Sequence, residues 1–288
     1  MAIRKLLVPL YGSPADDVAV TTAARVALTW HAHLVAVYFY RASNTMLALG
    51  PDIFPIGMLN EMVDDAESER AALIQAAQAR FTATCAAQGL ALGDATPDGT
   101  RASAAFMLTS GREDEAVAQL ARLADLTVVP HLDHDQDALF ADALHAALFD
   151  SGRPVLIAPH RVPETIGQRV CIAWNGTAES ASGVQAVLPW LTRAASVRIL
   201  TATGYHRRGP EAQALADYLA LHEIAAEVVN FQPVEKSVGL GLLKAADAFG
   251  ADLLAMGAYS HPRWRQTILG GVTRSVLERA TLPVLMSR

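Results

Sequence analysis

Three segments in the first half of this 288-residue chain recur in its second half, in the same order. The pairs are Leu7-Val-Pro-Leu-Tyr-Gly12-Ser13 with Cys171-Ile-Ala-Trp-Asn-Gly176-Thr177, Ala124-Asp-Leu with Ala251-Asp-Leu, and Pro154-Val-Leu with Pro283-Val-Leu. Self-similarity in a fixed order indicates a duplicated structural unit. The chain is therefore predicted to contain two copies of one domain, residues 1–160 and 168–288, with a turn-rich connector between them.

Each half is predicted to alternate buried strands with helices. The strand segments are short apolar runs without polar alternation, which is typical of a parallel sheet covered by helices on both faces. Strands are predicted at residues 5–10, 34–40, 104–109, 126–130, 155–158, 169–174, 197–202, 227–231, 253–257 and 284–287. Helices are predicted at residues 15–30, 59–88, 112–123, 137–149, 179–191, 210–221, 238–249 and 272–280. The predicted fold class is α/β, with two tandem, doubly wound, five-stranded parallel sheets of Rossmann-like type.

Composition excludes several classes of partner. The net charge of −6 and the pI near 5.8 argue against nonspecific nucleic-acid binding, which needs a basic face. No uncharged apolar run reaches the roughly 18 residues of a membrane span. The N-terminal apolar stretch is too short for a signal peptide, so the protein is expected to be cytoplasmic. Cys85 and Cys171 fall in different predicted elements and are expected to be buried, reduced thiols.

The segment from residue 251 to the C-terminus carries the main candidate for a binding site. A short apolar strand ends at Gly257, and the pair Gly270-Gly271 leads into a helix that begins near Val272. Glycines let a ligand approach the backbone, and unpaired N–H groups at a helix N-terminus favour an anion. The same pattern also fits a tight turn followed by an ordinary helix start.

This segment resembles the C-terminal signature of the universal stress protein family: Gly, two residues, Gly, nine residues, Gly, then Ser or Thr. Gly257 and Gly270 match the signature, whereas Ser260 and Gly271 occupy its second and fourth positions. The resemblance implies strand order 3-2-1-4-5 in each half and a pseudo-dimer of the two halves within one chain. It also implies that residues 155–158 and 284–287 pair antiparallel, and that the glycine amides wrap the phosphates of ATP.

The resemblance further assigns roles to individual side chains in the second half. Asn175 stands where the family has an Asp that holds the ribose, and an amide can still donate and accept. Ala173, Ala202 and Met256 match positions that line the adenine, although Met256 could equally fill the core. The implied cofactor is ATP or a related adenine nucleotide. The complete candidate set is Ala173, Asn175, Ala202, Met256, Gly257, Ser260, Gly270, Gly271, Val272 and Thr273, where Thr273 reaches a phosphate or caps the helix.

The resemblance implies that the protein is a stress-response signalling or binding module. The alternative is a scaffold that binds no nucleotide and acts through protein partners, including a second copy of the chain as a homodimer. Catalysis is not expected, because the sequence lacks a nucleophile elbow, a Walker loop, a His-Glu-x-x-His helix and a Cys-x-x-Cys pair. A nucleotide hydrolase of the same fold is kept as a third reading.

The first half lacks the features of the second. Pro130 stands where Gly257 does, and Ala141-Asp142 stand where Gly270-Gly271 do, so no phosphate site is expected there. The apolar loop at residues 42–59 is interpreted either as a lid or ligand wall, or as a flap over the core or a subunit contact. The polar cluster at residues 131–137, together with His145, contains residue types that can bind a metal. It lacks a defined ligand spacing, so no metal is expected.

Overall fold

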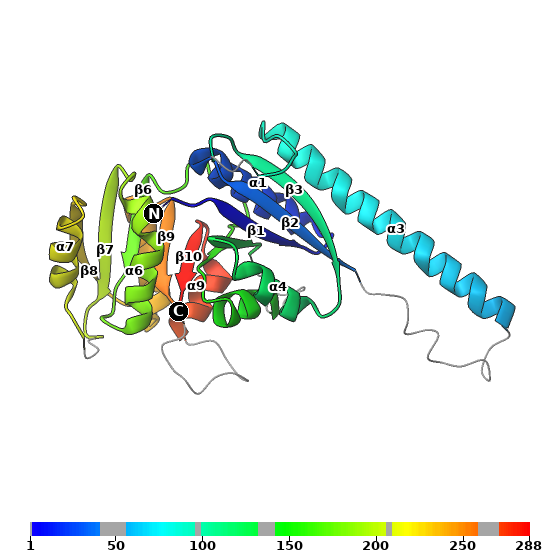
Figure 1. Cartoon of the computed structure of the whole chain (residues 1–288). Coiled ribbons are helices and arrows are strands. Elements are labelled where there is room, and N and C mark those ends of the chain that lie inside the picture. The colour runs from blue at the N-terminus through cyan, green and yellow to red at the C-terminus, as the bar shows by residue number, and fades with distance from the viewer. Residues whose placement is uncertain (1, 41–55, 96–98, 132–141, 206–208, 259–270) are drawn as a thin grey trace.

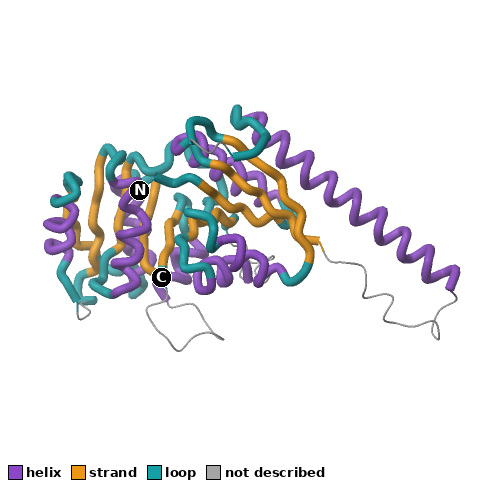
Figure 2. Tube along the Cα trace, viewed as in Figure 1, coloured by secondary structure: helices purple, strands orange, loops and turns teal. Residues whose placement is uncertain are grey.

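The fold is described from a computed structural model, which describes residues 2–40, 56–95, 99–131, 142–205, 209–258 and 271–288. Helices cover both faces of one long sheet (Figures 1 and 2). The first half contains β1 (Lys5–Leu10), α1 (Pro14–Trp30), β2 (His33–Tyr40), α3 (Ile56–Ala87), β3 (Ser103–Ser110), α4 (Glu113–Ala121), β4 (Leu126–Val129), the π-helix η1 (Ala146–Asp150) and β5 (Val155–Ile157). The second half contains β6 (Arg169–Ala173), α6 (Ala178–Leu191), β7 (Ser196–Ala202), α7 (Ala212–Ala220), β8 (Ala226–Phe231), α8 (Val238–Phe249), β9 (Leu253–Gly257), α9 (Gly271–Arg279) and β10 (Val284–Ser287).

The strand order confirms the predicted topology of both halves. The ten-stranded sheet runs β3-β2-β1-β4-β5-β10-β9-β6-β7-β8, so each half has the order 3-2-1-4-5 with parallel neighbours. β5 and β10 join the halves and pair antiparallel, with Leu156 opposite Leu285. This pairing was also predicted, and it covers two strand edges that would otherwise be exposed.

Two large apolar clusters and a small third one lie between the sheet and its helices, and the two large clusters extend across both halves. One lies on the side of α1, α3, α6 and α7, and the other on the side of α4, η1, α8 and α9. On the first side, Trp30 of α1 meets Trp190 of α6 edge-to-face, with ring centroids 5.6 Å apart. Such aromatic pairs add stabilisation beyond area burial. The halves therefore share a core as well as a sheet.

The predicted strands agree with the structure to within one residue at either end. The helix predicted at residues 137–149 differs in type, because its described part continues as a π-helix to Asp150. α3 is longer than predicted and extends away from the sheet (Figure 1). Residues 41–55 lie outside the described residues, so the two interpretations of the loop at 42–59 stay predictions. Cys85 and Cys171 are buried and unpaired, as predicted, and burial raises their pKa to about 11 and about 12.

Within the described ranges, no helix combines the length and the apolar character that crossing a membrane requires.

Candidate functional site

The predicted site residues on β6, β7 and β9 lie where the strand order reverses. β6 lies between β9 and β7, with Ile172 beside Ala255 and Ala173 beside Leu200. The carboxyl ends of these parallel strands therefore lie at one edge of the sheet. In doubly wound folds, ligands bind at this edge, at the switch point of the strand order.

Three of the predicted residues share one face of the sheet. Ala173, Ala202 and Met256 belong to the apolar cluster on the α8 and α9 side, where Ala202 and Met256 are buried. Trp174 lies on the opposite face, in the cluster with α6, and its Nε1 donates to the carbonyl oxygen of Pro210 at 2.9 Å. Side chains alternate between the two faces of a strand. The indole of Trp174 therefore does not fill the face that Ala173, Ala202 and Met256 share.

Asn175 lies in the exposed turn between β6 and α6. Its Oδ1 accepts hydrogen bonds from the backbone N–H of Thr177 at 3.1 Å and from the Thr177 hydroxyl at 2.9 Å. Thr177 in turn caps α6 by accepting from the N–H of Ser180 at 3.4 Å. The amide nitrogen of Asn175 has no hydrogen-bond partner in the part of the chain that the structure describes. The side chain thus fixes the turn with its oxygen, and its amide group remains a possible hydrogen-bond donor.

Gly257 has a packing role that its sequence position did not reveal. A Cβ atom at this position would lie 2.3 Å from the carbonyl carbon of Glu179 and 2.5 Å from the nitrogen of Ser180. On the facing helix, a Cβ at Gly183 would lie 2.8 Å from the carbonyl carbon of Met256. These two glycines let the backbones of α6 and β9 touch, so glycine is needed at Gly257 even without a ligand.

The N-terminus of α9 supplies the remaining described residues of the predicted site. Gly271 is exposed, with open space where a Cβ would lie, and its carbonyl oxygen accepts from the Ser275 hydroxyl at 2.8 Å. Val272 is half-buried and Thr273 is buried. Ser260 and Gly270 lie outside the described residues. The first turn of α9 presents backbone N–H groups that suit an anion.

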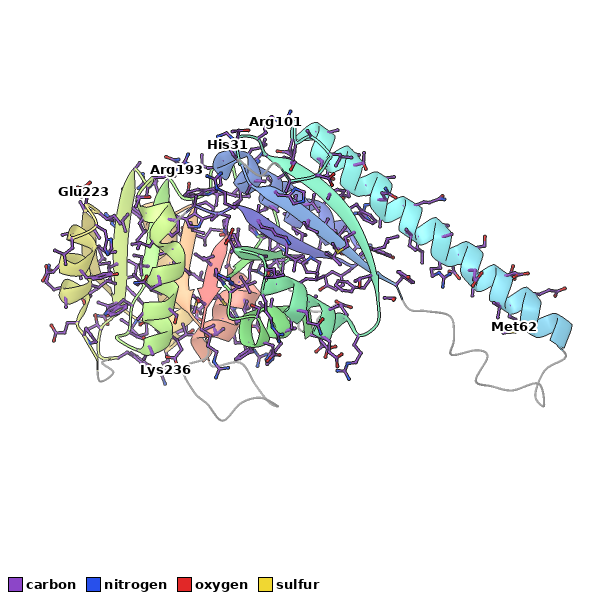
Figure 3. All side chains as sticks on the ribbon, viewed as in Figure 1. His31, Met62, Arg101, Arg193, Glu223 and Lys236 are labelled. Carbon is purple, nitrogen blue, oxygen red and sulfur yellow. The ribbon has the colours of Figure 1, made fainter. Side chains whose placement is uncertain are left out.

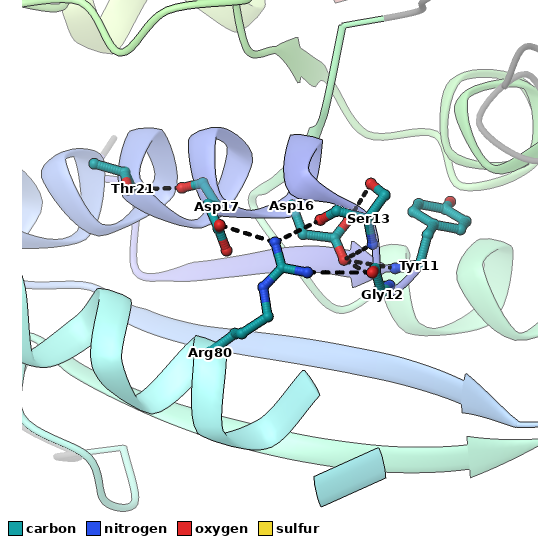
Figure 4. Close-up of polar contacts among 7 residues, drawn as sticks. All are labelled: Tyr11, Gly12, Ser13, Asp16, Asp17, Thr21 and Arg80. Carbon is teal, nitrogen blue, oxygen red and sulfur yellow. Dashed lines mark hydrogen bonds and ion pairs between the residues drawn. The ribbon is translucent and has the colours of Figure 1, made fainter. Parts of the chain in front are cut away.

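The corresponding turn of the first half is closed by its own side chains, as Figure 4 shows. The Oδ2 atom of Asp16 accepts hydrogen bonds from the backbone N–H groups of Tyr11 at 3.0 Å, Gly12 at 2.7 Å and Ser13 at 3.2 Å. Arg80 of α3 donates to the carbonyl oxygen of Ser13 at 3.0 Å and to Asp17 at 2.8 Å. Asp16 is buried, and this burial outweighs its hydrogen bonds and raises its pKa to about 6.

Sequence reasoning missed Asp16, although a signal was present. Ser13 followed by Asp16 three positions later is the spacing of a helix capping box, and the structure contains that box. The contact from Arg80 had no such signal, because α3 lies far along the chain and packs against α1 only in the folded protein.

Further carboxylates surround Tyr11, the residue that corresponds to Asn175. Burial raises the pKa of the Tyr11 hydroxyl well above its usual range, and nearby Glu113, Asp16 and Asp142 raise it further. A concentration of carboxylates at this edge repels phosphate. This charge distribution agrees with the expectation that the first half holds no phosphate. Among the described residues, no group of three His, Cys, Asp or Glu side chains is placed to hold a metal, and residues 132–141 lie outside them.

Comparison with known proteins places the chain among universal stress protein folds. A universal stress protein from Archaeoglobus fulgidus superposes with a TM-score of 0.66 at 13% identity, covering 99% of this chain and 96% of that one. The functionally unknown protein PA1789 from Pseudomonas aeruginosa gives a TM-score of 0.56 at 14% identity, covering 99% and 92%. The sequence model of the universal stress protein family matches residues 183–288. The family model therefore matches most of the second half of the chain, and both halves have the fold of these solved structures.

Two further comparisons add less. A universal stress protein solved in complex with cAMP matches 55% of this chain and 98% of its own length, at 20% identity and a TM-score of 0.34. That score supports no argument about the ligand of the present chain. A search of curated proteins gave no significant match to the sequence.

Proposed function

We propose that this protein is a stress-response binding module whose second half holds an adenine nucleotide at the carboxyl ends of β6, β7 and β9. The observation that carries the proposal is the hydrogen bonding and the position of Asn175. Its oxygen fixes the turn, its amide nitrogen has no partner among the described residues, and it lies at the switch point of the sheet. This leaves one donor for the oxygen of a ribose hydroxyl. The family match of residues 183–288 supports the same reading.

The roles of the surrounding residues follow from their positions. Ala173, Ala202 and Met256 provide an apolar face for the base, and the first turn of α9 provides N–H groups for the phosphates. Affinity is expected to be low for two reasons. An amide at Asn175 lacks the charge assistance of a carboxylate, and Gly271 supplies no hydroxyl.

A scaffold that binds no nucleotide is the second candidate, and packing favours it. Gly257 and Gly183 already serve the contact between α6 and β9. In addition, Gly209 lies against the turn after β6, where a Cβ would fall 2.0 Å from the carbonyl oxygen of Gly176. Under this candidate, the glycines of the second half are explained by packing alone, and proteins are the partners.

We also propose a binding role rather than a catalytic one. No nucleophile or general base has been assigned in the described part of the second-half site, so nucleotide is expected to be bound and released unchanged. Phosphate release from ATP over several hours, compared with a blank without protein, tests this expectation. Sustained release that disappears in a Gly270 variant would overturn it.

Calorimetric titration with ATP, ADP and AMP tests nucleotide binding. Asn175→Ala is expected to weaken binding by about twofold to tenfold, which is the range for the loss of one hydrogen bond. Asn230→Ala is the matched control, because Asn230 is an exposed asparagine on β8 whose side chain forms no hydrogen bond with a described residue. A loss of affinity in Asn175→Ala but not in Asn230→Ala supports the proposed site. The absence of binding by the unmodified protein would favour the scaffold.

The double variant Ser260→Gly with Gly271→Ser sharpens this test. It restores the family signature and is expected to strengthen ATP binding by about tenfold or more, because a hydrogen bond to a charged phosphate is worth more than a neutral one. A Cβ atom at Gly271 would have no atom of the described residues within 4 Å, so a side chain is expected to be tolerated there. An unchanged affinity would contradict the assignment of the phosphates to this helix start.

A further inference from the structure

A hollow of about 760 Å³ lies on one face of the first half, at the amino ends of β1, β2 and β3. The proposed nucleotide site lies in the other half, and the volume of the hollow falls in the range of small-molecule sites. Figure 3 shows His31 and Arg101, two residues of its wall, at the same end of the first half. The lining residues are Arg4, Lys5, His31, His33, Val35, Asp94, Ala95, Gly99, Arg101, Ala105, Phe106 and Met107.

The corresponding place in the second half is covered by a side chain, and this difference explains why the hollow is open. Arg169 begins β6 as Lys5 begins β1, and each donates its backbone N–H to an aspartate, Asp252 or Asp125. In the second half the ring of Phe249, the last residue of α8, covers this region. The guanidinium groups of Arg169 and Arg198 lie over that ring, 4.5 Å and 4.2 Å from its centroid.

α4 brings no aromatic ring to the corresponding place in the first half. It ends at Ala121, and the cluster beneath it is small, consisting of Leu7, Val35, Val37, Ala121 and Ala124 with two partly buried neighbours. The duplicated fold therefore leaves unfilled in one half a space that it fills in the other.

The wall of the hollow is cationic on a chain that is acidic as a whole. Among the described lining residues, Arg4, Lys5 and Arg101 are accompanied by one carboxylate, Asp94, although the chain carries a net charge of −6. His31 and His33 are also part of the wall. Clustered cations in a concave surface raise the local concentration of anions.

The backbone that carries these cations is held in place. Asp125 accepts hydrogen bonds from the N–H groups of Arg4 at 2.8 Å and Lys5 at 3.0 Å. The Arg4 guanidinium donates to the carbonyl oxygen of Gly99 at 2.8 Å. Nδ1 of His33 hydrogen-bonds to the Ser103 hydroxyl at 2.8 Å, linking β2 to β3. Fixed positions reduce the ordering cost of binding a ligand.

The remaining wall is apolar. Val35, Ala105 and Met107 line it, and Met107 is 38% exposed on an edge strand. We propose that this hollow is a second binding site, which takes a small organic anion with a phosphate or sulfonate group on an apolar body. The cations hold the anionic group, and the apolar residues contact the body. The proposal is independent of the nucleotide site.

Calorimetric titration with phenyl phosphate tests this site. Lys5→Met and Arg101→Gln are each expected to weaken binding by about threefold to tenfold, toward the upper range for contacts of partly exposed charges. Lys244→Met is the matched control, because Lys244 is exposed on α8 in the other half and forms no ion pair with a described residue. Asn175→Ala is expected to leave phenyl phosphate binding unchanged, which separates this site from the proposed nucleotide site.

Two further probes identify what the site recognises. Benzyl alcohol has the same ring without the charge and is expected to bind at least about tenfold more weakly, since it gains no charge-assisted contact. Met107→Ser is expected to weaken phenyl phosphate but not inorganic phosphate. The proposal is overturned if phenyl phosphate does not bind, if Lys244→Met weakens binding as much as Lys5→Met, or if benzyl alcohol binds equally well. Circular dichroism on each variant confirms that the fold is retained.

Discussion

The two turns that follow β1 and β6 begin from related sequences and end in opposite states. In the first half, the buried carboxylate of Asp16 takes three backbone N–H groups, and Arg80 bonds to the outside of the turn. In the second half the corresponding residue is Ser180, and the amide nitrogen of Asn175 has no hydrogen-bond partner within the described ranges. The two halves thus keep the same strand order, while a few polar residues change the hydrogen bonding of the turn that follows the first strand.

The largest expected effect is on the free energy of unfolding, and it comes from changes at the β5–β10 pairing that joins the two halves. Leu156 and Leu285 face each other across the β5–β10 pairing, and both are buried. Leu285→Ala and Leu156→Ala are each expected to lower the free energy of unfolding by about 2–5 kcal/mol, through lost burial and the cavity left behind. Urea unfolding measures this. Leu221→Ala, at a residue that is 83% exposed, is the control and is expected to change stability by less than about 0.5 kcal/mol.

The same experiment tests whether the two halves unfold together. Because one sheet and two apolar clusters run through both halves, each variant is expected to shift one shared transition. Two separate transitions, with each variant affecting only the one of its own half, would contradict the shared core.

A smaller effect distinguishes the two turns by pH. The pKa of Asp16 is about 6 in the folded protein, above its ordinary value of 3.8, so the folded state binds this proton more tightly than the unfolded state. The contribution of Asp16 to stability therefore rises as the pH falls from about 6 to about 4, by roughly 2–3 kcal/mol in all. The free energy of unfolding of the unmodified protein, minus that of Asp16→Asn, is expected to increase over this range.

The exposed Asp217→Asn variant separates this effect from the general loss of one surface charge. A difference between the unmodified protein and Asp16→Asn that stays constant from pH 7 to pH 4 would show that burial does not control Asp16.

The next effect concerns the glycine contact of the second half. Gly257→Ala places a Cβ against the backbone of Glu179 and Ser180, and a cost of about 1–3 kcal/mol is expected from overpacking. Gly271→Ala meets open space at the start of α9 and is expected to be neutral or slightly stabilising. Thermal unfolding of both variants measures the contrast. Equal destabilisation by the two changes would show that the α6–β9 contact does not require glycine.

The fold could be predicted closely from the sequence because buried parallel strands and amphipathic helices leave strong local patterns. β1 and α8 were predicted to the residue. The β5–β10 pairing, by contrast, came from the family resemblance, since no local pattern states which edges meet. The π-helical end of the first half was missed because its apolar spacing also fits an α-helix.

The site was less predictable, for reasons that lie in contacts distant along the chain. Asn175 could be singled out from its place after a strand, but its bonds to Thr177 were not anticipated. The packing role of Gly257 depends on how closely α6 approaches β9, and the contact of Gly209 with Gly176 depends on how two loops cross. Such approaches are set by tertiary packing, which single-residue patterns do not encode.

Hydrogen exchange with and without saturating ATP tests the central claim most directly, because it compares the two turns within one molecule. Slower exchange is expected for the amides at residues 174–180 and 271–275. No change is expected at residues 11–16, where Asp16 already holds the N–H groups of Tyr11, Gly12 and Ser13. The Asn175→Ala variant, measured in parallel at the same ATP concentration, is expected to show a smaller effect. Protection at residues 11–16, or equal protection of both turns, would contradict the claim that only the second half is open to a nucleotide.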